Sequence, residues 1–176
     1  PVSSFDTHIS IPGRHMVYNA LAAAAVGYAL GLTDEEIAQG IASNVPIAGR
    51  NNLIEGKCYT VIDDCYNANP ASMKSSLDVL AYADTRTAAV LGDMFELGAD
   101  EKKMHYNVGV HAAEKGIDVL LCIGALSAEI ARGARETANS TEAENEAQTS
   151  SMEIHHYKKK AEFFADAETV LKEGDT

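Results

Sequence analysis

The sequence predicts an α/β fold in which a mostly parallel sheet is covered by helices on both faces, preceded by a helical hairpin. Three observations support this. From Leu53 onward, short apolar runs alternate with longer segments of helical periodicity, which is the order that parallel sheets require. Before Leu53, two helical segments follow each other directly. Several apolar runs end in polar loops, and in open α/β sheets ligands bind at the carboxyl ends of strands.

The first part of the chain is expected to contain one strand and two helices. Residues 5–11 alternate apolar and polar residues, as strands do. Residues 16–30 are almost all apolar, but the run is short and interrupted by glycines, so we expect a buried helix and not a membrane span. Thr33 and Glu36 form a capping box for a second helix over residues 34–43.

A domain boundary is predicted in the segment 46–52, which is rich in glycine, proline and asparagine. Residues 1–48 then form one unit and residues 49–176 another. In the second unit, apolar residues on both sides of Gly56-Lys57 predict a β-hairpin over 53–62. The further expected elements are a helix over 70–83 capped by Asn69, a strand over 87–91, a helix over 100–115, a strand over 117–123, a helix over 124–136, a polar connection over 139–151, a strand over 153–157 and a helix over 165–173. The chain stops in a turn at residues 174–176, and we expect that a last strand is missing.

Composition narrows the classes of function. Hydrophobic residues make up 46% of the chain, enough for a core, and the net charge is −12, which disfavours a nucleic-acid partner. The three cysteines form no CxxC pair, which fits a reducing compartment better than a disulfide scaffold. We therefore expect a cytoplasmic protein without membrane insertion.

Three blocks of sequence resemble the Mur ligase family. Asp63-Asp64-Cys65-Tyr66-Asn67-Ala68-Asn69-Pro70, followed by Ser72-Met73, is similar to its DDSYNANPxSM signature. Leu91-Gly92-Asp93-Met94-Phe95-Glu96-Leu97-Gly98, with His105 and Gly109, is similar to LGDMxELG…H…G. Both signatures are typical of the branch that adds D-alanyl-D-alanine to UDP-N-acetylmuramoyl-tripeptide. Residues 13–23 resemble the GxHNxxNxxAA segment of Mur ligases in general, although Met16 stands where the family commonly has asparagine.

The resemblance implies a Rossmann-like domain over 49–176, after a remnant of a central ATPase domain over 1–48. It implies ATP-dependent amide bond formation through an acyl phosphate, in bacterial peptidoglycan precursor synthesis. The phosphate-binding loop and the KGS motif of the family are absent from the sequence, so this chain alone is expected to be inactive. ATP and Mg²⁺ are the implied cofactors, with Mg²⁺ held mainly by the missing part of the central domain. The implied substrates are UDP-N-acetylmuramoyl-tripeptide and D-alanyl-D-alanine.

The same resemblance assigns residues to ATP. Asp64 matches the aspartate that binds the ribose, Arg50 matches an arginine that reaches phosphate or ribose, and Asn19 matches an asparagine that contacts adenine. A carboxylate and a guanidinium suit those ligands. Asn67 and Asn69 are further candidates for ATP binding, with local backbone satisfaction as the alternative. No catalytic residue and no metal ligand is assigned.

Asp93, Glu96 and His105 are candidates for contacts with D-alanyl-D-alanine or the peptide. The alternative is that these acids complement the dipole of the helix that follows. Cys65 has no histidine placed to activate it, and we interpret it as a small half-buried residue.

Two other functions stay open at this point. One is a different ligase of the Mur or folylpolyglutamate type, which the first two blocks argue against. The other is a Rossmann-like binding module with no catalytic role.

Overall fold

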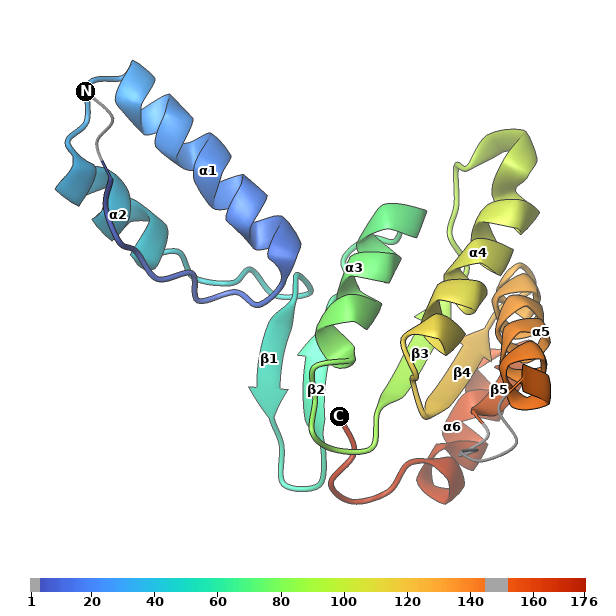
Figure 1. Ribbon diagram of the computed structural model, residues 1–176. Coiled ribbons are helices and arrows are strands. Elements are labelled where there is room, and N and C mark those ends of the chain that lie inside the picture. Colours follow the sequence, from blue (N-terminus) through green and yellow to red (C-terminus); the bar gives the residue numbers. More distant parts are fainter. Residues whose placement is uncertain (1–3, 145–151) are drawn as a thin grey trace.

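The computed structural model describes residues 4–144 and 152–176. Its first part is a hairpin of two helices, α1 (Arg14–Ala29) and α2 (Asp34–Ala42), which lies to one side of the rest of the chain (Figure 1). The predicted capping box is confirmed, because Thr33 Oγ1 accepts the Glu36 N–H and Glu36 accepts the Thr33 N–H.

Two predictions for this part are wrong. Residues 5–11 form no strand. They run beside α2, and the Thr7 and Ser10 hydroxyls donate to the carbonyls of Ala38 and Asn44. Helix α1 is not buried, since Gly27 is its one buried residue. Its periodicity identified the helix correctly, but apolar composition alone does not show what covers a helix.

The second part contains two sheets. Strands β1 (Asn52–Glu55) and β2 (Thr60–Asp63) form the predicted antiparallel hairpin. Strands β3 (Ala88–Gly92), β4 (Val119–Ile123) and β5 (Glu153–Tyr157) form a parallel sheet in the order β3-β4-β5. The helices are α3 (Pro70–Leu80), α4 (Glu101–Glu114) after a short 3₁₀ turn (Gly98–Asp100), α5 (Ser127–Glu144) and α6 (Lys160–Val170). This is the predicted α/β class, with the parallel sheet limited to three strands.

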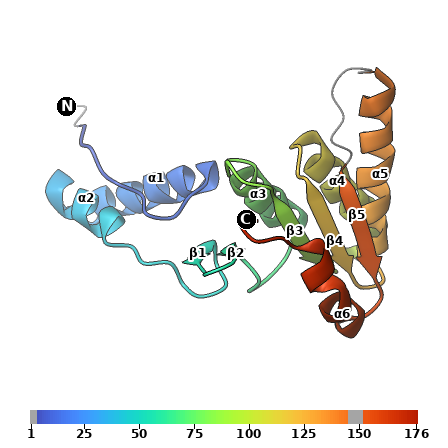
Figure 2. The ribbon, with the colours of Figure 1, turned by 90° about the horizontal axis from the view of Figure 1, so that it is seen from below.

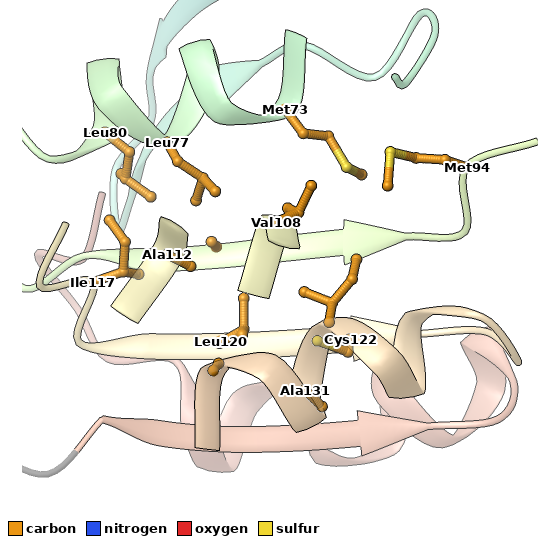
Figure 3. Close-up of a cluster of buried hydrophobic side chains, with 13 residues drawn as sticks. Met73, Leu77, Leu80, Met94, Val108, Ala112, Ile117, Leu120, Cys122 and Ala131 are labelled. Carbon is orange, nitrogen blue, oxygen red and sulfur yellow. The ribbon is translucent and has the colours of Figure 1, made fainter. Parts of the chain in front are cut away.

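Strand β4 explains why both faces of the sheet are covered. Leu120 and Cys122 point into a core shared with α3, α4 and α5, which Figure 3 shows. Val119 and Leu121 point the other way, into a smaller core with residues of β5 and α6. Figure 2 shows α6 on the face of the sheet opposite α4 and α5. A strand buried on both faces reads as continuously apolar, which is how the sequence identified β4.

The chain ends between the hairpin and the parallel sheet. Gly174 N–H donates to Cys58 O and Thr60 N–H donates to Asp175 O on the hairpin side. Thr176 donates to Arg86 O and accepts from Ala88 N–H, as residues of adjacent parallel strands do. The last residues therefore separate β2 from β3, which is why the hairpin does not join the larger sheet directly.

Arg86 holds the C-terminal residues in place through ion pairs. Its guanidinium contacts Asp175 Oδ2 and Glu153 Oε2, each at 2.8 Å. Glu153 also accepts a hydrogen bond from His155 at 2.8 Å. These partners lower the pKa of the Glu153 carboxyl, with the hydrogen bond to His155 as the largest cause.

Two helix boundaries differ from the predictions. Helix α5 extends to Glu144, so residues 139–144 of the expected polar connection are helical, and residues 145–151 lie outside the described part. Helix α6 begins at Lys160, five residues early, because Glu162 accepts the N–H groups of Lys158 and Lys159. The run Lys158-Lys159-Lys160 has no apolar pattern, so the sequence did not indicate this helix start.

Candidate functional site

A cleft of about 860 Å³ opens where β2 and β3 end. Its walls are largely apolar and come from the hairpin, α3 and β3, with Ile62, Met73 and Leu77 among the lining residues. Of the predicted site residues, Asp64, Asn67 and Asp93 line it. The two loops that sequence reasoning selected therefore do meet at one cleft, as the topology of an open α/β sheet requires.

Asp64 lies at the end of β2 and is partly buried. Its Oδ1 accepts the Asn51 N–H at 3.0 Å and its Oδ2 accepts the Ser76 hydroxyl of α3. A carboxylate has about four acceptor positions, so Asp64 can still accept hydroxyl groups of a ligand. Ser76 had no signal in the sequence, because a serine inside a helix is ordinarily a surface residue.

Asp63 turns toward the linker that joins the two parts of the chain. Its Oδ2 accepts the Gly49 N–H at 3.1 Å, and its Oδ1 accepts the Cys65 N–H at 3.4 Å. The pKa of the Asp63 carboxyl is lowered, mainly by a hydrogen bond from the Cys65 thiol. The same contact raises the pKa of that thiol, which argues against a nucleophile, but Cys65 is exposed and not half-buried as expected.

Arg50 is exposed and does not line the cleft. Its guanidinium carbon lies 4.2 Å from the centre of the Tyr66 ring, a cation–π distance. Tyr66 belongs to the loop between β2 and α3, so Arg50 is held beside the loop that carries Asp64 and Asn67.

The two asparagines of this loop have local partners. Asn69 Oδ1 accepts the N–H groups of Ala71 and Ser72, each at 3.0 Å, and so caps α3 as predicted. Asn67 Oδ1 accepts the Ala68 N–H at 2.9 Å, and its side chain is exposed at the cleft. Asn67 is thus the asparagine of the pair that faces the cleft.

The loop after β3 is fixed by Asp93 and His105. Asp93 accepts the N–H groups of Ala125 and Ser127, at 3.0 Å and 2.7 Å, and so caps α5. His105 is fully buried: Nε2 accepts the Met94 N–H at 2.9 Å and Nδ1 donates to Glu101 O at 2.7 Å.

The three substrate candidates differ in their access to a ligand, because Asp93 lines the cleft and His105 and Glu96 do not. His105 has both ring nitrogens occupied and is out of reach of a ligand, so it holds the loop in place. Glu96 is exposed, with a left-handed backbone (φ 61°), and does not line the cleft. Phe95, which the sequence did not single out, is 73% exposed and lines the cleft mouth.

Asn19 lies on the exposed surface of α1, where its Nδ2 contacts Met16 Sδ at 3.4 Å, and it does not line the cleft. Met16 thus contacts the side-chain amide of Asn19, the residue that the family resemblance places at adenine. Within residues 4–144 and 152–176, no three His, Cys, Asp or Glu side chains gather as metal ligands. Among the helices of the described residues, none combines the length and the hydropathy that a membrane span needs.

The fold and cleft define an α/β domain with a ligand site at its strand ends. The family described as Mur ligase, glutamate ligase domain, matches residues 49–176, and the chain therefore belongs to the Mur ligase family. Within it, the chain is 40% identical over 125 residues to the UDP-N-acetylmuramoyl-tripeptide–D-alanyl-D-alanine ligase of Escherichia coli, and 38% identical over 130 residues to that of Bacillus subtilis.

These matches cover 70% and 72% of this chain but 28% of each relative. Among solved structures, MurF from Acinetobacter baumannii superposes with a TM-score of 0.77 at 26% identity. That match covers 96% of this chain and 35% of the MurF chain. The chain thus spans about a third or less of the length of the proteins it resembles.

Proposed function

We propose that this chain belongs to a ligase that joins D-alanyl-D-alanine to UDP-N-acetylmuramoyl-tripeptide in the bacterial cytoplasm. It is the part of that ligase that closes over the nucleotide and the amine substrate. Residues 1–48 are then the end of a central ATPase domain and residues 49–176 are the C-terminal domain. The observation that carries the proposal is the meeting of Asp64, Asn67 and Asp93 at one cleft. Identity to ligases of this specificity supports the choice of substrates.

Asp64 fits the ribose of ATP. It stands partly buried at a strand end, and hydrogen bonds from two directions fix its carboxylate, so that its remaining acceptor positions are held ready for hydroxyl groups. Arg50 fits the phosphates, because its charge is held beside the same loop and its planar fork matches phosphate oxygens.

The described residues offer no cluster of three ligands for Mg²⁺. In this proposal the metal belongs to the remainder of the central domain, and no step is assigned to it here. When bound, ATP and Mg²⁺ would supply the activation of the peptide carboxylate. The residues of this chain would orient the nucleotide and the amine, which is the main protein contribution to such phosphoryl and acyl transfers.

Phosphate release tests the proposal. The full-length gene product should release phosphate from ATP when both the UDP-linked tripeptide and D-alanyl-D-alanine are present, and the chain of 176 residues alone should release none. Phosphate release with free amino acids or glutamate in place of D-alanyl-D-alanine would favour another ligase specificity. A full-length product without any release would favour a non-catalytic binding module.

A further inference from the structure

The linker at Gly49, Arg50 and Asn51 is held by hydrogen bonds on both sides of the arginine. Gly49 donates to Asp63 Oδ2 at 3.1 Å, and its carbonyl accepts the Tyr66 N–H at 3.0 Å. Asn51 donates to Asp64 Oδ1 at 3.0 Å. The backbone of Arg50 is therefore attached at each neighbour to the end of β2 or to the loop after it.

Two left-handed residues flank Arg50, so this linker conformation needs such support. Gly49 has φ 75° and Asn51 has φ 52°, in the left-handed region that glycine adopts freely and that asparagine tolerates better than most other residues. A Cβ on Gly49 would lie 3.2 Å from both Cβ and N of Tyr66, so the two backbones nearly touch. Without its hydrogen bonds, this short segment has more relaxed conformations available.

The Asn51 side chain makes few good hydrogen bonds. It is 5% exposed, and its Oδ1 is the buried side-chain atom without a hydrogen-bond partner in the described residues. Its Nδ2 lies 3.4 Å from Pro12 O and from His15 Nε2, both long contacts. The Asn51 side chain therefore contributes little to the position of the linker. The carboxylates of Asp63 and Asp64, which accept backbone N–H groups of the linker, contribute more.

We propose that Asp63 is a positioning residue, which holds Gly49 so that Arg50 lies on Tyr66 at the side of the cleft that carries Asp64. The proposal rests on the proposed function, in which Arg50 and Asp64 contact ATP. Asp63 itself does not touch the nucleotide. Its carboxylate acts one residue away from Arg50, through a backbone hydrogen bond that a charged acceptor strengthens.

The alternative is that Asp63 only stabilises the fold, and that Arg50 stacks on the Tyr66 ring without its help. The stack can be measured directly, because the Tyr66 ring shifts the NMR signals of the Arg50 side chain. In the chain of 176 residues, we expect Asp63→Ala to move these signals to the values of a Tyr66→Leu variant, which has no ring. Asp84→Asn removes one charge from an exposed aspartate and should leave them unchanged.

A second arm uses the full-length ligase. Asp63→Ala should raise the KM for ATP about tenfold, the order expected for one hydrogen bond to a charged group, with a smaller change in the KM for D-alanyl-D-alanine. Asp63→Asn keeps an acceptor oxygen and should lie between wild type and Asp63→Ala. It also serves as the test variant if the alanine variant does not fold.

The two arms separate the positioning role from the proposed function. Arg50 signals that stay at wild-type values in folded Asp63→Ala and Asp63→Asn would overturn the positioning role. Signals that move while the KM for ATP stays constant would uphold the positioning of Arg50 and would instead contradict its contact with ATP.

Discussion

Replacing Gly109 by alanine should destabilise the protein strongly, although alanine is the better helix former. Gly109 lies in α4 where that helix meets α5, and an added Cβ would stand 1.9 Å from Ile130 O and 2.9 Å from Ala134 N. Gly133 of α5 makes the reciprocal approach, with its Cβ position 2.2 Å from Tyr106 O. Both contacts are with backbone, so no side chain can rotate away and the helices must move apart.

The expected magnitude follows from two opposing effects. Alanine in place of glycine inside a helix stabilises by about 1 kcal/mol. Overpacking in a core costs about 1–3 kcal/mol, and a clash with helix backbone belongs at the upper end. The net loss for Gly109→Ala should therefore be about 2 kcal/mol, measured by urea unfolding followed by far-UV circular dichroism.

Gly40→Ala is the matched control, because Gly40 lies in α2 with no atom within 4 Å of its Cβ position. That variant should be as stable as wild type or more stable. A Gly109→Ala variant that unfolds at the urea concentration of wild type, or above it, would refute the close helix contact.

Three further predictions concern the helix cap at Asn69, the reactivity of the three thiols and the loss of stability at acid pH. Asn69→Ala should lower the free energy of unfolding by about 1 kcal/mol, because α3 loses its cap; an unchanged urea midpoint would contradict this. A thiol reagent should modify the exposed Cys58 and, more slowly, the exposed Cys65, whose pKa is raised by its hydrogen bond to Asp63; Cys122 should react only after unfolding, since burial raises its pKa to about 12. Early loss of all three thiols would be inconsistent with that core. The lowered pKa of Glu153 contributes stability that is present above the ordinary carboxyl value of 4.5 and is lost as pH falls through the lower folded value, so wild type should lose more stability than Glu153→Gln as the pH falls from about 5 downward.

The elements that the sequence predicted correctly are those with local causes. The capping box at Thr33 and the cap at Asn69 depend on side chains within three residues of the helix start, and the hairpin depends on its turn. Strand β4 was recognisable because burial on both faces makes it continuously apolar. Such features need no knowledge of distant neighbours.

The failures depend on distant partners. Residues 5–11 have the alternation of a strand but no sheet edge beside them, so their hydroxyls bond to the carbonyls of α2 and the segment after it. Helix α5 continues past residue 139 although the segment is polar, because helix propensity does not require an apolar face in every turn.

The candidate site was predictable in its outline and not in its details. The order of strands and loops placed Asp64 and Asp93 at the same edge, and the cleft contains both. No local pattern distinguishes an aspartate that binds a ligand from one that caps a helix 34 residues away, as Asp93 does at Ser127 of α5. The burial of His105 likewise depends on packing between α4 and the loop at Met94.

The most direct test of this account is the ATP dependence of the full-length ligase with Asp64→Ala. If the cleft at the end of β2 receives the ribose, the variant should show a raised KM for ATP while the KM for D-alanyl-D-alanine changes less. An ATP dependence equal to that of wild type, in a variant that folds normally, would contradict the assignment of this cleft to the nucleotide.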